Sequence, residues 1–187
     1  MSAKLERIYT PFGNLIFHIT GNEPSEEIFK VLWQVSTHFA VVNSNVPFMT
    51  GINDGKSKKK KFKGAFDSFP VLTKLMTNMW WVEEWPGTYS FKPDKLLVFG
   101  KTSAREYDNF FCFSDNIFWH GPDSWDDLML FVDNKLLFYS CTHEEFGSII
   151  GNKELFFRMR LSKTTPCLNK TWLIKGYSIP IELLQQV

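Results

Sequence analysis

The sequence predicts a single α+β domain with a mainly antiparallel sheet and two or three helices packed on one face of that sheet. Three observations support this prediction. Several segments alternate apolar and polar residues with the period of a strand and are separated by short turns. Two other segments have apolar residues three and four positions apart, which is the spacing of a helix. Helices do not alternate regularly with strands, so parallel strands with crossover connections are not expected.

The composition is that of a folded protein of ordinary size. The 187 residues are 44% hydrophobic and 22% charged, and a chain of this length is expected to form one domain, residues 1–187. The net charge of +1 gives no overall field that would attract nucleic acid or an anionic membrane. The N-terminus lacks the apolar core of a signal peptide, and no apolar run is long enough to span a bilayer. We therefore expect a cytoplasmic protein without membrane contact.

In the N-terminal half, the patterns predict one strand and two helices. Residues 14–20 form the expected strand, because their odd-numbered members are apolar. The first helix is expected over 24–39, with Pro and two acids in its first turn. Residues from about 43 to 66 read as an irregular Lys-rich loop. The second helix is expected over 68–85, because the Pro-Gly pair that follows favours a turn.

The C-terminal half consists mostly of short alternating segments, which are typical of strands. The expected strands are residues 95–99, 109–113, 117–120, 127–132, 135–140, 155–161 and 172–179. The fourth and fifth should form a hairpin across Asp133 and Asn134, with a helix beginning at Ser124 as the alternative for the fourth. A capping box at Thr142 to Glu145 predicts a helix of two turns that reaches Ile150.

No sequence motif identifies a catalytic residue, a metal ligand or a cofactor. The three cysteines are an odd number without a CxxC pair, so neither a disulfide framework nor a zinc knuckle is expected. Cys112 and Cys141 lie in apolar runs, which favours buried, inert thiols. The chain has no GxSxG elbow. Gly55-Lys56-Ser57 resembles the end of a phosphate-binding loop, but Thr50 stands where that loop needs a glycine.

The densest polar cluster is the segment from His120 to Asp127. It contains one imidazole and three carboxylates, Asp123, Asp126 and Asp127. Such groups bind divalent metals or transfer protons when a loop holds them together. The same Gly-Pro-Asp-Ser composition also occurs in ordinary turns, and no metalloenzyme spacing such as HExxH is present. An ordinary turn and an acid–base or metal site therefore remain alternatives.

Aromatic residues are abundant, with 19 Phe, 7 Trp and 5 Tyr. Such rings fill protein cores and also anchor interfaces. Trp80 and Trp81 fall on the second expected helix, where adjacent side chains are separated by about 100°. Both rings would then be buried only if the helix were covered on two sides. An exposed indole at this end of the helix would be an interface anchor.

Lysines are concentrated in the expected loop. They are Lys56, Lys58, Lys59, Lys60, Lys61 and Lys63, with Phe62 among them. Lysines neutralise a phosphate backbone while a ring stacks on a base, so this run is a candidate nucleic-acid-binding segment. A solvated loop and a docking segment for an acidic protein surface are the alternatives.

Three stretches carry a family resemblance. They are Lys95 to Gly100, Tyr107 to Asn116 and Asp123 to Phe131. Their pattern of strands and turns resembles the small cytosolic immunity proteins of bacterial toxin systems. The resemblance covers these stretches alone and implies an α+β module without catalysis that occupies one cognate toxin.

Three functional hypotheses follow from the sequence. The first is a non-enzymatic immunity or inhibitor protein that occludes one protein partner, such as a toxin with a basic surface. Its candidate binding residues are Trp81, Glu83, Glu84, Trp85, Trp119, His120, Asp123, Trp125, Asp126 and Asp127. The second is nucleic-acid binding through the lysine run. The third is an enzyme centred on His120 and the neighbouring acids.

Overall fold

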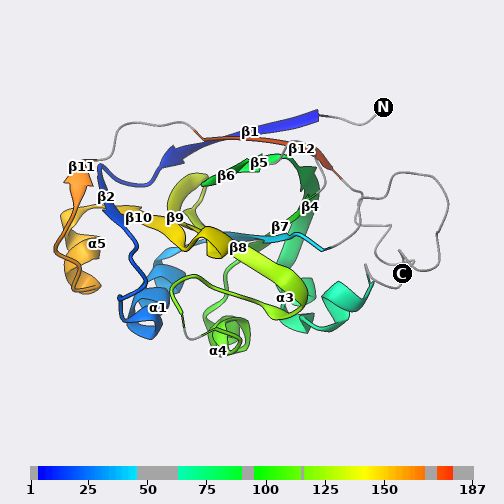
Figure 1. The fold of residues 1–187 in the computed structure, drawn as a ribbon, viewed down its shortest axis with the longest axis horizontal. Coiled ribbons are helices and arrows are strands. Elements are labelled where there is room, and N and C mark those ends of the chain that lie inside the picture. Colours follow the sequence, from blue (N-terminus) through cyan, green and yellow to red (C-terminus); the bar gives the residue numbers. More distant parts are fainter. Residues whose placement is uncertain (1–3, 46–62, 90–94, 115, 167–171, 179–187) are drawn as a thin grey trace.

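One large, mainly antiparallel sheet organises the molecule (Figure 1). The computed structural model describes residues 4–45, 63–89, 95–114, 116–166 and 172–178. The strands are β1 (Lys4–Pro11), β2 (Leu15–His18), β3 (His38–Asn43), β4 (Met76–Val82), β5 (Glu84–Trp85), β6 (Thr88–Tyr89), β7 (Lys95–Lys101), β8 (Trp125–Val132), β9 (Lys135–Cys141), β10 (Phe146–Gly151), β11 (Thr165–Pro166) and β12 (Trp172–Ser178). The helices are α1 (Ser25–Val35), α3 (Pro70–Leu75), α4 (Tyr107–Phe111) and α5 (Lys153–Arg158), with 3-10 turns η1 (Ala104–Glu106), η2 (Pro122–Ser124) and η3 (Thr142–Glu144).

The sheet is strongly curled. Its strand order is β1-β12-β4-β7-β3-β8-β9-β10-β2-β11. The end of β1 also pairs with β9 in a parallel arrangement, through Thr10 and Pro11. Figure 1 shows the result: β1 and β12 pass over the face of the sheet that lies opposite the helices. The short β5–β6 ribbon lies on the same side as β1 and β12 (Figure 1).

Both faces of the central strands are buried, and successive side chains enter different clusters. In β8, Leu128 and Leu130 join the cluster under the helices, whereas Met129 and Phe131 join the cluster inside the curl. The same alternation occurs in β3, β4 and β7. This is the period of a strand whose two faces are both covered. The sequences of the central strands are therefore nearly continuous apolar runs.

Each of the helices α1, α3, α4 and α5 contributes to the cluster on the outer face of the sheet. Helix α1 buries Ile28, Phe29, Leu32 and Trp33, four residues on one side of its axis. Phe29 stacks on Phe111 of α4, with ring centroids 4.6 Å apart. The prediction of a single α+β domain with helices on one face of a mainly antiparallel sheet is thus confirmed. Within the part of the chain that the structure describes, no helix is long and apolar enough to cross a membrane.

Several expected elements are confirmed. Strand β2 places Phe17 on the buried face, as the alternation predicts. Strands β7 and β12 and the β8–β9 hairpin also lie where the sequence places them. The hairpin turns at Asp133, whose φ of 54° is a conformation that Asp tolerates well. The helical alternative for β8 is wrong.

The two predicted N-terminal helices are both too long. Helix α1 ends at Val35. The Ser36 N–H still donates to the Leu32 carbonyl, but the Thr37 N–H donates to the Phe131 carbonyl of β8. Phe39 accordingly lies in β3, a strand that the sequence analysis missed, as it missed β1. Helix α3 ends at Leu75, and the remaining residues form β4, paired with β7 and β12.

Four predictions in the C-terminal half are wrong. Residues 107–111 form α4 and residues 153–158 form α5, where strands were expected. Asn152 starts α5, since its side-chain oxygen accepts a hydrogen bond from the Leu155 N–H at 2.9 Å. Residues 117–120 form no strand. The capping box at Thr142 yields only η3, because Glu145 adopts a left-handed conformation and the following residues pair with β9 as β10.

Candidate functional site

A β-bulge at the start of β8 brings two carboxylates to one side of the sheet. Val42 of β3 pairs with Asp126 and Ala40 pairs with Met129, so Asp127 and Leu128 together oppose one residue. Asp127 has a φ of 50°, a left-handed conformation that Asp adopts more readily than most residues. In a regular strand neighbouring side chains point to opposite faces. The bulge instead lets Asp126 and Asp127 line the same pocket.

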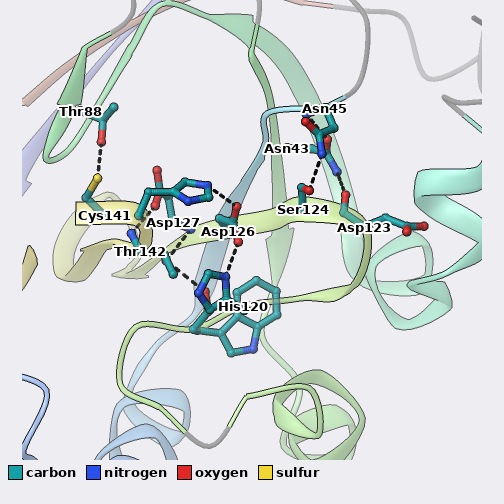
Figure 2. Close-up of polar contacts among 12 residues, drawn as sticks. Asn43, Asn45, Thr88, His120, Asp123, Ser124, Asp126, Asp127, Cys141 and Thr142 are labelled. Carbon is teal, nitrogen blue, oxygen red and sulfur yellow. Dashed lines mark hydrogen bonds and ion pairs between the residues drawn. The ribbon is translucent and has the colours of Figure 1, made fainter. Parts of the chain in front are cut away.

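Two histidines contact the first of these carboxylates. His120 Nδ1 lies 2.8 Å from Asp126 Oδ1 (Figure 2). His143 Nε2 lies 3.0 Å from Asp126 Oδ2. The Asp126 side chain is only 6% exposed, whereas those of His120 and His143 are 54% and 66% exposed. One buried carboxylate is therefore shared by two imidazoles that solvent can reach.

The two rings lie 6.2 Å apart between centroids, at an interplanar angle of 71°. Each ring directs one nitrogen toward Asp126. Within the described residues, His120 Nε2 and His143 Nδ1 have no hydrogen-bond partner. We call His120, Asp126 and His143 the His–Asp–His cluster.

Asp127 has a different environment. Its Oδ2 accepts a hydrogen bond from Trp85 Nε1 at 3.0 Å, and its Oδ1 accepts one from the Thr142 N–H at 2.6 Å. Thr142 Oγ1 in turn donates to the Trp119 carbonyl at 3.1 Å. Burial raises the pKa of Asp127 above its ordinary value, partly offset by these two N–H donors. The nearby Asp126 carboxylate raises this pKa further, and His143 lowers it.

The turn that precedes Asp126 is held by an asparagine of β3. Asp123 and Ser124 both have left-handed backbones, with φ values of 50° and 61°. The Asn43 side chain donates to the Asp123 carbonyl at 2.8 Å, and the Asn45 amide donates to the Ser124 hydroxyl (Figure 2). Non-glycine residues in this conformation are uncommon and occur often at functional sites.

A pocket of about 370 Å³ lies beside the cluster. It is lined by Val42, Ser44, Trp85, Thr88, Lys95, Asp126, Asp127, Cys141, His143 and Glu144. The Cys141 thiol is buried and accepts a hydrogen bond from the Thr88 hydroxyl at 3.2 Å (Figure 2). Burial raises the pKa of this thiol, so it is a poor nucleophile near neutral pH.

The proposed aromatic anchors are buried. The exposed fractions of Trp81, Trp85, Trp119 and Trp125 range from 0% to 5%. The expectation of an exposed indole is wrong, because residues 76–82 form a strand with two covered faces and so bury both Trp80 and Trp81. Trp119 and Trp125 donate to the Phe110 and Ala65 carbonyls.

The acidic candidates lie in several environments. Glu83 and Glu84 are half-buried near the β5–β6 ribbon, and Asp123 is exposed. Of the candidate acids, Asp126 and Asp127 line the pocket. The candidate nucleic-acid-binding residues Lys56, Lys58, Lys59, Lys60 and Lys61 lie outside the described residues. Lys63 is described, and it is exposed at the start of a helical turn.

Sequence reasoning did not place His143 in the site. His143 falls in the helix expected from Thr142 to Ile150, whereas the structure places it directly after β9 in η3, with its side chain exposed. The predicted hairpin contained the necessary signal. A turn at residues 133–134 places the first residues of β8 opposite those just after β9, and hence His143 near Asp126.

The comparisons with known proteins add no assignment. No family model, no curated protein and no solved structure matches this chain. Among the described residues, no group of three or more His, Cys, Asp and Glu side chains is arranged to hold a metal ion.

Proposed function

We propose that the protein is an enzyme in which His120 and His143 act as a general acid–base pair oriented by Asp126. A single observation carries this proposal: one buried carboxylate contacts both imidazoles at 2.8 and 3.0 Å. A carboxylate in this position fixes the orientation of an imidazole and stabilises the imidazolium form. The remaining nitrogen of each ring is then available to exchange a proton with a substrate.

The surroundings support an acid–base role rather than covalent catalysis. The Cys141 thiol is buried and its pKa is raised by that burial. The Thr142 hydroxyl donates to the Trp119 carbonyl and is itself buried. The nucleophile is therefore expected to be water or a group of the substrate.

The experiment is an activity survey with His and Asp variants. Purified protein is incubated with carboxylic esters, phosphomonoesters, phosphodiesters and RNA, and product formation is measured. For any substrate turned over, we expect His120→Ala and His143→Ala each to lower kcat by about 10²-fold or more. Asp126→Asn should also lower kcat, because it removes the charge that orients both rings.

His18→Ala is the matched control. His18 is an exposed histidine on β2 whose Nδ1 contacts the Ser148 hydroxyl, and it does not line the pocket beside the cluster. This variant should retain wild-type kcat. Circular dichroism of each variant checks folding. Wild-type activity in folded His120→Ala and His143→Ala proteins, or no turnover of any substrate class, would contradict the proposal.

A second candidate is a protein-binding function of the inhibitor or immunity kind. The observation that favours it is three exposed acids on the turns that precede β8 and follow β9, Asp123, Glu144 and Glu145, of which Glu144 lines the pocket. Because the candidate indoles are buried, recognition of a basic partner would depend on these charges and would act mainly on the association rate.

This candidate predicts a stoichiometric protein partner that survives nuclease treatment in a pull-down from the source cells. Glu144→Gln and Asp123→Asn should then slow association at low salt. Unchanged association rates with the captured partner would refute the role of these acids.

A further inference from the structure

The His–Asp–His cluster suits a reaction in which one oxygen loses a proton while another gains one. The two imidazoles share one carboxylate, their ring centroids lie 6.2 Å apart, and each ring keeps a second nitrogen that does not contact Asp126 and can exchange a proton. Transfer of a phosphoryl group between two oxygens has this requirement, since the attacking and leaving oxygens lie on opposite sides of phosphorus.

Two residues on either side of the lysine run in the sequence, Asn45 and Ala65, form hydrogen bonds with the segment that precedes Asp126. Asn45 donates to Ser124, and Trp125 Nε1 donates to the Ala65 carbonyl at 2.8 Å. Phe66 also packs edge-on against Trp125, with ring centroids 5.3 Å apart. Asn45 and Ala65 flank the lysine run in the sequence, and they bond to the two residues directly before Asp126. The described lysine of that run, Lys63, is exposed, and Lys95 lines the pocket.

We propose, building on the acid–base function above, that the substrate is single-stranded RNA and that its own 2′-hydroxyl is the nucleophile. One imidazole of the cluster takes the 2′-hydroxyl proton, and the 2′-oxygen forms a bond to the adjacent phosphorus. The bond from phosphorus to the 5′-oxygen breaks, and the second imidazole, in its protonated form, gives its proton to that oxygen. The products are a 2′,3′-cyclic phosphate and a free 5′-hydroxyl. No oxidation or reduction occurs, and the two rings exchange protonation states.

This substrate class also fits the engaged hydroxyl and thiol groups of the site. A nucleophile supplied by the ribose requires no Ser, Thr or Cys of the protein, and the Thr142 and Cys141 groups take part in hydrogen bonds within the fold. The acidic residues of the pocket must be compatible with an anionic substrate, because a free carboxylate repels phosphate. Asp126 is paired with two imidazoles, and both oxygens of Asp127 accept N–H groups. Glu144 is exposed on the pocket wall and remains as a repelling charge.

The test uses a fluorescent DNA oligonucleotide that contains one ribonucleotide. We expect a single cut on the 3′ side of that ribose, with a 2′,3′-cyclic phosphate identified by mass spectrometry, and no cut in the all-deoxy oligonucleotide. His120→Ala and His143→Ala proteins, purified in the same way, should cleave at least 100-fold more slowly, and His18→Ala should match the wild type. This comparison also excludes a contaminating ribonuclease.

A second substrate tests the division of roles between the histidines. In this oligonucleotide, sulfur replaces the 5′-oxygen that leaves, and a sulfur leaving group needs no proton. Cleavage should be restored in the variant that lacks the general acid and should remain slow in the variant that lacks the general base. Restoration in both variants or in neither would overturn the assignment of one acid and one base.

Charge at the pocket wall provides a third readout. Glu144→Gln should raise kcat/KM for the ribonucleotide substrate a few-fold at low salt, and the increase should disappear at high salt. Glu154→Gln, on α5, is the control and should leave kcat/KM unchanged. A decrease in kcat/KM for Glu144→Gln would contradict an anionic substrate.

Different experimental outcomes would contradict the RNA inference and the proposed acid–base function. If the all-deoxy oligonucleotide is cut equally well, or if only another ester is turned over in a His-dependent reaction, the RNA inference is wrong and the acid–base function stands. If RNA is cut equally well by the two His variants, or if nothing is turned over, both are wrong.

Discussion

Asp126 and Asp127 are neighbours in the chain, and both are buried, but they are bonded to different kinds of groups. Asp126 contacts two half-exposed imidazoles, those of His120 and His143. Asp127 accepts hydrogen bonds from the buried Trp85 indole and from the Thr142 backbone N–H. The first arrangement leaves groups available for a substrate, whereas the second joins β8 to the β5–β6 ribbon and to η3. We infer that Asp126 serves function and Asp127 serves stability.

The largest expected effect is on stability at Asp127. Asp127→Ala leaves two buried donors, Trp85 Nε1 and the Thr142 N–H, without acceptors, at a cost of about 3 kcal/mol in the free energy of unfolding. Asp126→Ala leaves imidazoles that water can reach, so it should change this free energy by less than about 1 kcal/mol. Urea denaturation of the two variants measures both values. Equal losses would contradict the proposed difference between the two carboxylates.

The β8–β9 hairpin and the polar cluster from His120 to Asp127 can be predicted from the sequence more easily than most of the remaining strands can. The β8–β9 hairpin was predictable, because its turn residues and its apolar runs have clear signatures. The apolar pattern of β4 predicts a helix, because the curl of the sheet covers both faces of this strand. Met76, Met79 and Trp80 then match helical spacing by chance. Whether both faces of a strand are covered depends on pairings between distant segments, which a local pattern does not contain.

Only part of the site can be predicted from the sequence, again because a local pattern does not contain contacts between distant segments. His120 and Asp126 are six residues apart and were grouped correctly from sequence. His143 joins them through the hairpin and lies beyond the range of a local motif. The bulge at Asp127 was not predictable, because it arises from the register between β8 and β3.

A somewhat smaller effect on stability is expected at Gly121, which directly follows His120 and whose N–H donates to the Trp125 carbonyl. A Cβ at this position would lie 2.6 Å from the buried Trp119 ring and 3.0 Å from Trp125 Cβ. Gly121→Ala should therefore cost about 2 kcal/mol in the free energy of unfolding. It should also displace His120 and thereby lower any His-dependent activity.

The matched control for this substitution is Gly64→Ala. Gly64 lies in the helical turn of residues 63–67, and a Cβ there would meet no heavy atom within 4 Å. This variant should be at least as stable as the wild type, because Ala favours a helix more than Gly does. If Gly121→Ala is stable but loses activity, the Asp126 environment can be disturbed separately from that of Asp127.

The smallest expected effect is a pH dependence of stability that Asp127 contributes. Burial raises the pKa of Asp127, so the folded protein retains this proton in a pH range where the unfolded chain has lost it. The free energy of unfolding must then fall as the pH rises from the ordinary aspartate value of 3.8 to the higher folded value. Asp127→Asn removes this contribution. The stability difference between wild type and this variant should therefore decrease with rising pH over that range.

Glu106 provides a control of opposite sign. Its carboxylate accepts hydrogen bonds from Lys74 and Asn109, and these bonds lower the pKa of Glu106. The folded protein therefore loses this proton at a lower pH than the unfolded chain does, and the bonded carboxylate stabilises the fold above the ordinary glutamate pKa. The stability difference between wild type and Glu106→Gln should increase as the pH rises through the range below that value. Denaturant unfolding at a series of acidic pH values gives both curves. If the two stability differences changed with pH in the same direction, the Asp127 carboxylate would not be held in the buried environment described for it.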